Sequence, residues 1–368
     1  MSQSGIYSES KLVWWYAREQ KLPDAPKQVQ LILSDLCNQD CHFCAYRMSG
    51  YSSNQLFVGN SELAKVGHNN PKRWIPTKRA LELIDEIADL GCLSVQFTGG
   101  GEPTAHPEHE QIFSRALDRG LRCSLVSNGI NWHANLIENI LPRFDWVRVS
   151  IDAANEASYS KIRRVPKKHW EKVWAHVRHF SKQQKETTFG LGFVVTPESY
   201  KQIYDFALLA KANSAQNVRF TAMFSTDDEE PFVPIYDEIK GLIYKAKRLE
   251  TDTFKVYDNF GSRFDDLQQH APDYSNCSYQ HYTAYIGGDL QAYRCCVLAY
   301  NKRGLVEGGD LSQRSFKDFW LSQARKDDMN ALDARGCERC QFNAKNRSLL
   351  YVMGDTKSDT ESRHLEWP

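Results

Sequence analysis

Short apolar segments alternate with amphipathic segments along residues 28–225 of this chain, and this rhythm limits the folds open to it. The clearest amphipathic segment is Thr77–Leu90, in which Leu81, Ile84 and Ile87 recur at helical spacing. A series of strand–helix units favours a parallel sheet with helical crossovers, so the expected fold class is α/β, a barrel or part of one. The predicted strands are Val29–Leu33, Ser94–Phe97, Cys123–Val126, Trp146–Ile151, Thr188–Val195 and Val218–Ala222.

The rhythm changes after about residue 226, where an acidic segment indicates a linker or loop. A helix is predicted over Ile235–Leu249, and two short strand candidates, Tyr282–Ile286 and Gln291–Tyr293, flank a Gly-Gly-Asp turn that is typical of a hairpin. We therefore expect a second, smaller α+β domain after the barrel. The predicted parts are an N-terminal extension over 1–27, the barrel over 28–225 and the smaller domain over 226–368.

A long polar segment, Ala45–Ile75, interrupts the strand–helix rhythm. Loops of this length inside a compact domain are usually functional or disordered. We expect it to cover the catalytic end of the barrel, with Lys72, Arg73 and Trp74 as candidate substrate contacts. The alternative is an excursion that Trp74 anchors to the core.

The composition gives no sign of a nucleic-acid or membrane partner. Lys and Arg total 46, equal to the total of Asp and Glu, so the formal net charge is zero. No segment approaches the roughly 18 apolar residues of a membrane-spanning helix, and the N-terminus lacks a secretory signal pattern. We therefore expect a cytoplasmic protein with reduced thiols. A basic stretch over 161–168 is interpreted as a solvated helix face, with an anion site as the alternative.

Eight of the ten cysteines fall in two groups, which in a reducing compartment indicates metal binding or catalysis. The first group, Cys37, Cys41 and Cys44, directly follows the first predicted strand. Three thiolates at this spacing can hold one cluster within a single loop. A [4Fe–4S] cube normally has four cysteine ligands, so three leave one iron open to a substrate or cofactor. The alternative is a zinc site formed by the three cysteines and His42.

The spacing Cys37-x3-Cys41-x2-Cys44 resembles that of the radical S-adenosylmethionine (SAM) superfamily. Further motifs occur in the family's order: Gly99-Gly100-Gly101-Glu102-Pro103, Ser127-Asn128-Gly129, Ser150-Ile151-Asp152 and Val195-Thr196, each at the end of a predicted strand. The resemblance covers roughly residues 28–225 and implies a partial (β/α)6 TIM-type barrel. In parallel α/β barrels the active site lies at this end of the strands.

The resemblance also implies two cofactors, SAM and a [4Fe–4S] cluster held by the three cysteines. The glycine–glutamate element is expected to hold the methionine amino group, because glycines permit close approach and Glu102 is an anionic acceptor. Polar groups after the third and fourth strands are expected at the ribose and carboxylate, and Thr196 at the adenine. The implied SAM-binding residues are Phe43, Gly100, Gly101, Glu102, Ser127, Asn128, Ser150, Asp152 and Thr196.

The second cysteine group lies in the smaller domain and suits a four-ligand iron–sulfur or zinc site. It resembles the twitch domain, a shortened relative of the SPASM extension, which implies one auxiliary [4Fe–4S] cluster. The family usually places a glycine five residues before the second ligand, whereas Gly288 lies seven residues before Cys295, so Cys295 and Cys296 both remain open. We prefer Cys295. The implied ligands are then Cys277, Cys295, Cys337 and Cys340.

With Cys295 as the ligand, Cys296 is expected to be free near the active site. A thiol there can donate a hydrogen atom to a substrate radical, as in some relatives that invert stereocentres. A spare buried cysteine or an alternate ligand is the structural alternative. Cys92 and Cys123 lie in apolar segments and are predicted to be core residues.

The resemblance implies reductive cleavage of SAM to a 5′-deoxyadenosyl radical that abstracts hydrogen from the substrate. An amino-acid-like or peptide substrate is preferred, because most twitch and SPASM relatives act on peptides. The outcome is then isomerisation, epimerisation or oxidation by an isomerase or oxidoreductase, with a flavodoxin- or ferredoxin-type electron donor. Alternatives are a carbohydrate dehydrogenase or epimerase, an isomerase of glycyl-modified thymidine in viral DNA, and a non-catalytic iron–sulfur or zinc protein.

Overall fold

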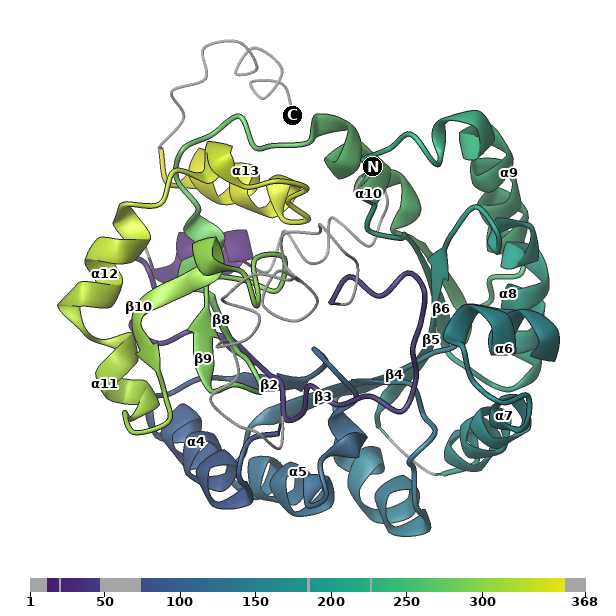
Figure 1. The fold of residues 1–368 in the computed structure, drawn as a ribbon, viewed down its shortest axis with the longest axis horizontal. Coiled ribbons are helices and arrows are strands. Elements are labelled where there is room, and N and C mark those ends of the chain that lie inside the picture. Colours follow the sequence, from purple (N-terminus) through teal and green to yellow (C-terminus); the bar gives the residue numbers. More distant parts are fainter. Residues whose placement is uncertain (1–11, 20, 47–73, 184–185, 226, 355–368) are drawn as a thin grey trace.

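The computed structural model describes residues 12–19, 21–46, 74–183, 186–225 and 227–354. The strands within these residues form one sheet, in the order β10-β9-β8-β1-β2-β3-β4-β5-β6-β7. The sheet curves into an open barrel with helices on its outer side (Figure 1). Most of the predicted loop Ala45–Ile75, including Lys72 and Arg73, lies outside the described residues.

Seven consecutive strands of the sheet are parallel, which confirms the predicted α/β fold class and the partial barrel. All six predicted strands are present, and β7 is a further strand that the sequence analysis did not predict. The parallel strands are β1 (Gln28–Leu31), β2 (Ser94–Phe97), β3 (Arg122–Ser127), β4 (Trp146–Ser150), β5 (Thr188–Val195), β6 (Asn217–Ala222) and β7 (Lys255–Asp258).

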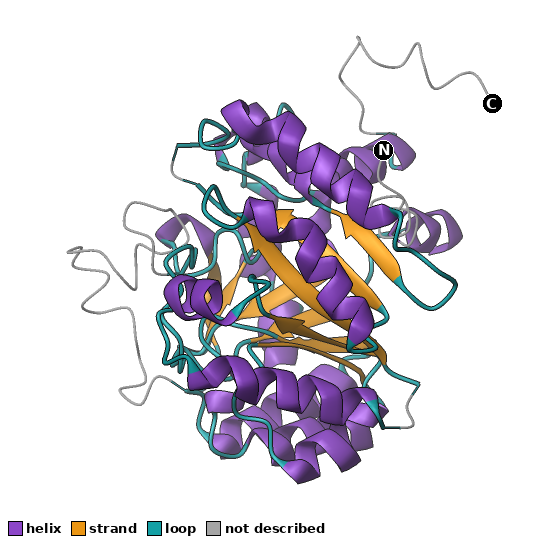
Figure 2. Cartoon of the chain, turned by 90° about the vertical axis from the view of Figure 1, so that its right-hand side faces the viewer, coloured by secondary structure: helices purple, strands orange, loops and turns teal. Residues whose placement is uncertain are grey.

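Helices cover the outer face of the parallel strands, as the side view shows (Figure 2). Between β3 and β4 the chain forms a π-helical turn, Leu136–Ile140, followed by a short 3-10 turn. The helix α6 was not predicted. The helices of this layer are α4 (Thr77–Asp89), α5 (His109–Asp118), α6 (Glu156–Arg163), α7 (Lys168–Ser181), α8 (Ile203–Ala212), α9 (Tyr236–Lys247) and α10 (Phe260–Gln269). Among the described residues, no helix is both long and apolar enough to cross a membrane.

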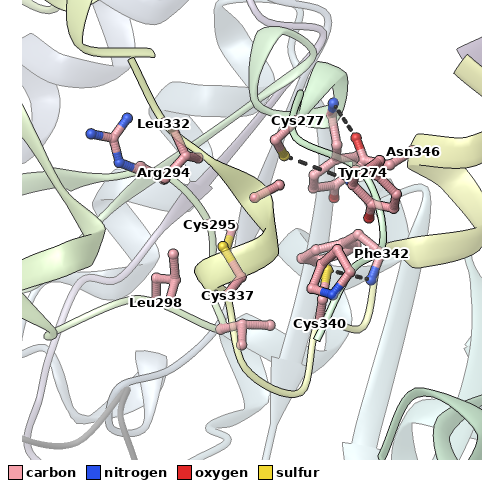
Figure 3. Close-up of a pocket in the computed structure, with 14 residues that line it drawn as sticks. Tyr274, Cys277, Arg294, Cys295, Leu298, Leu332, Cys337, Cys340, Phe342 and Asn346 are labelled. Atoms are coloured by element: carbon pink, nitrogen blue, oxygen red, sulfur yellow. Dashed lines mark hydrogen bonds between the residues drawn. The ribbon is translucent and has the colours of Figure 1, made fainter. Parts of the chain in front are cut away.

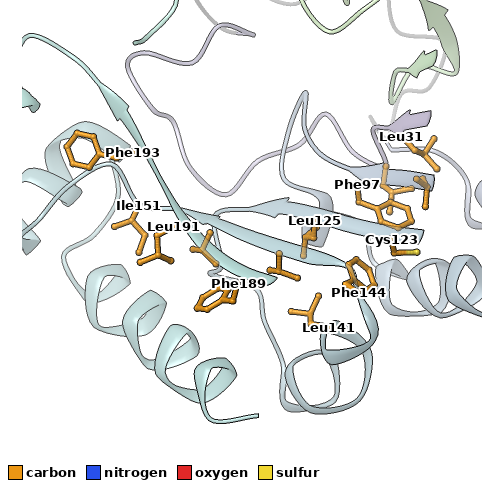
Figure 4. Packing of buried hydrophobic residues seen from close by; sticks show 14 of the residues in the cluster. Leu31, Phe97, Cys123, Leu125, Leu141, Phe144, Ile151, Phe189, Leu191 and Phe193 are labelled. Carbon is orange, nitrogen blue, oxygen red and sulfur yellow. The ribbon is translucent and has the colours of Figure 1, made fainter. Parts of the chain in front are cut away.

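The main core lies between the sheet and this helical layer (Figure 4). Phe113 of α5 packs with its ring centroid 4.5 Å from that of Phe97 and 5.5 Å from that of Phe144. Cys92 and Cys123 are buried in the same core, as predicted, and burial raises the pKa of each thiol to about 12. Both thiols therefore stay protonated, which fits packing residues rather than ligands.

The C-terminal part continues the same sheet. Strand β8 pairs in parallel with β1, and β9 and β10 follow in antiparallel pairing, which confirms the predicted hairpin. Because β7 and β8 both pair with barrel strands, the two predicted domains share one sheet, and the division at residue 225 stays a prediction. The elements are β8 (Thr283–Ile286), β9 (Gln291–Tyr293), β10 (Leu305–Asp310), α11 (Phe316–Trp320), α12 (Gln323–Asn330) and α13 (Asn343–Val352).

Candidate active site

The first cysteine group lies in the loop after β1, at the carboxyl edge of the parallel strands. Two backbone hydrogen bonds dock this loop onto the end of α6: Asp40 donates to the carbonyl of Arg163 at 3.1 Å and His42 to that of Ile162 at 3.2 Å. The residues Cys37, Cys41 and Cys44 are half-buried. The loop is therefore fixed by its backbone.

The side chain of Arg163 lies against this loop. It donates a hydrogen bond of 2.8 Å to Gln39, approaches the Cys41 sulfur at 3.6 Å and forms a buried ion pair with Asp152. Burial raises the pKa of the Cys41 thiol, and the neighbouring guanidinium opposes that rise. A buried cation beside a cluster ligand favours the thiolate form that iron binds.

Arg163 was missed as a site residue, because the sequence analysis placed it in a basic stretch expected to be a solvated helix face. That expectation is wrong for Arg163, which is 4% exposed, whereas Arg164 is exposed and pairs with Asp40 at the surface. The available signal was spacing, since Tyr159, Ile162 and Arg163 lie on the buried face of α6. A charged residue on an apolar face usually has a buried partner.

The glycine-rich turn after β2 packs directly on the start of the cysteine loop. Gly101 donates its amide to the Ser34 carbonyl at 3.0 Å, and Glu102 to that of Leu36 at 2.9 Å. A Cβ added at Gly101 would overlap the Leu36 carbonyl oxygen and lie 2.6 Å from its carbon, and one added at Gly100 would lie 2.8 Å from the hydroxyl of Tyr300. Side chains larger than glycine at positions 100 and 101 would therefore clash with the segments packed against this turn.

Glu102 is 2% exposed and ties the ends of β2 and β3 together. One carboxylate oxygen accepts hydrogen bonds of 2.7 Å from the hydroxyls of Thr104 and Ser127, and the other accepts one of 2.7 Å from the amide of Asn128. Asn128 in turn donates to Asn38 at 2.6 Å and lies 3.9 Å from the Cys37 sulfur. Glu102 thus positions the β3 loop against the cysteine loop; its predicted contact with SAM stays a prediction.

The remaining predicted SAM-binding residues lie at the same edge of the barrel. Asp152 has a positive φ of 64° and accepts a hydrogen bond of 2.7 Å from the Val194 amide, so it ties the end of β4 to β5. Phe43 lies 6.0 Å from the Arg163 guanidinium. Thr196 is fully buried with its hydroxyl 3.1 Å from that of Ser199. The structure thus gathers Asn128, Asp152 and Phe43 around the cysteine loop, and encloses Thr196 in its own turn.

The second cysteine group lines one apolar cavity (Figure 3). Two N–H groups point at its sulfurs, since the Asn346 amide donates to Cys277 at 3.6 Å and the Phe342 backbone to Cys340 at 3.4 Å. Such hydrogen bonds to sulfur are a feature of protein iron–sulfur sites. Burial raises the pKa of Cys277 to about 11 and that of Cys340 to about 12, so these thiols become ligands only if a metal group replaces their protons. The lining cysteines are Cys277, Cys295, Cys337 and Cys340.

Cys296 does not line this cavity, although it is next to Cys295 in the sequence. Its sulfur accepts a hydrogen bond of 2.8 Å from Gln341 and interacts electrostatically with Arg219 of β6. Both cysteines pack against the cluster of Tyr279, Val297 and Phe342, and Cys296 also packs against the cluster that includes Tyr285 of β8. This arrangement fits Cys295 as the ligand and places Cys296 beside β8.

The zinc alternative for the first group combines His42 with its three cysteines. Among the described residues, no three His, Cys, Asp or Glu side chains converge on one metal ion. His42 lies with one ring nitrogen 3.3 Å from the Ile162 carbonyl and the other 3.6 Å from Glu198, away from the cysteines. Zinc requires sulfurs about 2.3 Å from one centre, whereas an iron–sulfur cube spreads its ligands over several irons.

Sequence comparisons agree with this geometry. Residues 31–210 match the model of the radical SAM superfamily. The S-adenosylmethionine-dependent nucleotide dehydratase of Flammeovirga pacifica is 26% identical over 136 residues, which are 37% of this chain and 42% of that protein. The dTDP-4-amino-4,6-dideoxy-D-glucose ammonia-lyase of Streptomyces venezuelae is 27% identical over 206 residues, 52% of this chain and 38% of that protein. The chain thus spans less than half the length of these curated relatives.

Structural comparisons give the same fold over most of the chain. SuiB of Streptococcus suis, solved with its precursor peptide SuiA, has a TM-score of 0.60 and 12% identity, and covers 88% of this chain and 71% of its own. A structure of anSMEcpe with bound AdoMet has a TM-score of 0.58 and 12% identity. The match covers 89% of this chain and 96% of the anSMEcpe chain. The fold and the site define a partial α/β barrel with a three-cysteine loop at the carboxyl edge of its strands. Residues 31–210 form a radical SAM domain, and this family implies SAM and a [4Fe–4S] cluster as cofactors.

Proposed function

We propose that this radical SAM enzyme cleaves SAM reductively and modifies an amino-acid-like or peptide substrate by isomerisation, epimerisation or oxidation. The observation that carries the proposal is the joint placement of Cys37, Cys41 and Cys44 beside the buried Arg163–Asp152 pair at the carboxyl edge of the barrel. Bound cluster and SAM supply a 5′-deoxyadenosyl radical for hydrogen abstraction. A flavodoxin- or ferredoxin-type protein is the proposed electron donor.

The chain's own residues position and shield this chemistry. The three cysteines would hold the cluster, and Arg163, 3.6 Å from the Cys41 sulfur, would supply a fixed positive charge for the carboxylate of SAM. Ser150, Asp152 and Asn128 are proposed to orient the ribose and carboxylate, the Gly100–Glu102 turn the amino group, and Thr196 the adenine. The proposed site lies in a barrel whose outer face is covered by helices, which limits water access from that side.

An auxiliary [4Fe–4S] cluster is proposed in the cavity of the C-terminal part, held by Cys277, Cys295, Cys337 and Cys340. The N–H···S contacts from Asn346 and Phe342 support it. Cys296 is proposed as the hydrogen-atom donor to the substrate radical, because it is the cysteine of this region that turns from the cavity toward β6. If Cys296 has this role, the reaction ends in epimerisation rather than net oxidation.

A second candidate substrate is a nucleotide or a nucleotide-linked sugar. This substrate class is closer to the carbohydrate alternative than to a peptide. Two relatives favour it by name, the nucleotide dehydratase and the dTDP-sugar ammonia-lyase. The reaction class is then that of a lyase. Modified thymidine in viral DNA receives no comparable support, because the basic stretch over 161–168 includes Arg163, which is buried.

The proposal is tested by anaerobic reconstitution with iron and sulfide, followed by incubation with SAM and dithionite. The parent protein is expected to form 5′-deoxyadenosine, detected by chromatography and mass spectrometry. The triple variant C37A/C41A/C44A is expected to form none, because no ligand for the cluster remains. The variant C92A is the matched control, since it removes a thiol from the core outside both cysteine groups. Equal 5′-deoxyadenosine formation by the triple variant would overturn the proposal.

A further inference from the structure

Two arginines, Arg148 of β4 and Arg219 of β6, face the interior of the barrel. On both strands the alternate residues, such as Val149 and Phe220, belong to the core beneath the helices, so the arginines lie on the opposite face. Strand pairing sets Ser150 opposite Gly192 and Gly192 opposite Arg219. Arg148 lies opposite Gly190, so the two arginines flank β5 with an offset of two residues, and the charge of Arg219 acts on Arg148.

Glycine on the intervening strand leaves room between them. A Cβ added at Gly192 would lie 3.4 Å from the Arg148 side chain and 3.6 Å from the Ser150 hydroxyl. These contacts show that the Arg148 stem leans along the inner face of β5 toward the carboxyl edge of the sheet. Barrel interiors are usually filled by branched aliphatic side chains, so this combination of arginine, glycine and serine is unusual for a packed interior.

Neither arginine has an acidic partner in the part of the chain that the structure describes. The Nε of Arg219 is buried without a hydrogen-bond partner, and Arg148 has no ion pair there, with the ring of Trp146 5.5 Å away. Asp152 is near Arg148 but is already paired with Arg163. Burial, followed by repulsion from Arg219, lowers the pKa of Arg148 to about 9. Both arginines are half-buried, and two neighbouring cations without an acidic partner in such a place favour an anion that is brought by a ligand.

The cofactor is not the best match for this anion. The carboxylate of a bound SAM would be held beside the cysteine loop by Arg163, which lies 3.6 Å from the Cys41 sulfur. Arg219 lies three residues before the end of β6 and interacts instead with Cys296, the proposed hydrogen-atom donor. Arg219 thus lies between the inner face of β5 and the proposed hydrogen-atom donor.

We propose that Arg148 and Arg219 bind an oxyanion of the substrate, a phosphate or a carboxylate, and so orient the substrate between SAM and Cys296. The inference rests on the proposed function and narrows the substrate to an anionic molecule. Arginine suits the role because its planar fork binds carboxylate and phosphate through paired hydrogen bonds. Gly192 contributes the space that the oxyanion occupies.

The test uses reconstituted, SAM-loaded protein and isothermal titration calorimetry with two probes, inorganic pyrophosphate and malonate. The parent is expected to bind at least one, and the one that binds more tightly identifies the phosphate or the carboxylate class. The double variant R148Q/R219Q is expected to lose at least tenfold in affinity for that probe. The variant R148K/R219K keeps the charge but not the paired hydrogen bonds, so its affinity is expected to lie between those of the parent and the glutamine variant. The control R143Q removes an arginine that is 51% exposed on the outer surface, and it is expected to bind as the parent does.

Iron content and SAM affinity are measured on the same samples. An R148Q/R219Q protein that holds iron and SAM like the parent but has lost the anion confirms the inference. It is overturned if neither probe binds the parent, if the glutamine variant binds the probe equally well, or if that variant loses SAM affinity by the same factor, which would assign the pair to the cofactor. A parent that binds the anion but forms no 5′-deoxyadenosine would contradict the proposed function separately.

Discussion

Arg163 and Asp152 form an ion pair whose side chains are 5% and 1% exposed, at the end of β4 and directly beneath the cysteine loop. The pair joins two segments that are needed for the site. Asp152 holds the Val194 amide, and Arg163 holds Gln39 and approaches Cys41. Removing one partner leaves the other charge buried and alone, which is more harmful than removing both.

We therefore expect D152A to destabilise the protein by about 3–5 kcal/mol, the usual cost of breaking a buried pair. The double variant D152A/R163M removes both charges and is expected to recover part of this loss, while reducing 5′-deoxyadenosine formation at least tenfold because the cation beside Cys41 is gone. The measurements are anaerobic urea unfolding and the SAM cleavage assay. The surface pair Arg143–Asp118 supplies a matched control, D118A, for which a change below about 1 kcal/mol is expected. A D152A protein as stable as D118A would show that the buried pair does not hold the loop.

A second prediction concerns the glycine-rich turn after β2, where an added Cβ has no room. G101A places a Cβ against the backbone of Leu36, which cannot move without shifting the loop that leads to Cys37. We expect this variant to bind less than half of the parent's iron at the first site. The control is G241A in α9, where an added Cβ meets nothing within 4 Å and alanine is expected to stabilise the helix by about 0.5–1 kcal/mol. Iron analysis and melting temperature distinguish the two variants, and full iron content in G101A would contradict the account.

Many features of the fold and of the candidate site were predictable from the sequence. The alternation of apolar segments with amphipathic segments, and the order of the motifs, can be seen from residue spacing alone. The strands, the β8–β9 hairpin and the placement of Cys37 after β1 are confirmed for this reason. Arg163 and Arg148 could not be assigned in the same way. The role of Arg163 depends on its buried partner Asp152, and that of Arg148 on the strands paired beside it. A short sequence motif encodes neither the partner of a buried charge nor the pairing of strands. Strand β7 was missed because only four residues pair, with an exposed Lys255.

Adjacent cysteines give a third prediction. C295A removes a thiol that lines the auxiliary cavity, whereas C296A removes one that does not. If the cavity holds a [4Fe–4S] cluster, the parent binds about eight irons and C296A does too, while C295A retains about four. C296A is also expected to leave the substrate radical unquenched, so turnover to the epimerised product falls while 5′-deoxyadenosine still forms. Iron and zinc analysis checks the first part. Stoichiometric zinc in the parent would contradict the auxiliary cluster, and loss of iron in C296A alone would reverse the assignment.

Acid sensitivity of the C-terminal part gives the last prediction. Burial, with a smaller contribution from Arg325, lowers the pKa of His281 to about 4, against an ordinary value of 6.5. A histidine whose pKa is depressed by folding binds its proton more readily in the unfolded chain. Its neutral form therefore favours the fold fully above pH 6.5, and this contribution is lost progressively as the pH falls from 6.5 toward 4.

The change is tested by comparing anaerobic melting temperatures of the parent and H281N at pH 7.5 and 5.5. Asparagine cannot take up a proton, so the parent is expected to lose about 1 kcal/mol more stability than H281N over this interval. The difference between the two proteins removes effects common to both, such as acid lability of the clusters. Equal losses would show that His281 titrates normally in the folded protein, and a larger loss in H281N would reverse the sign of its pKa shift. H270N is the matched control, because His270 is 47% exposed and pairs with Asp228 at the surface.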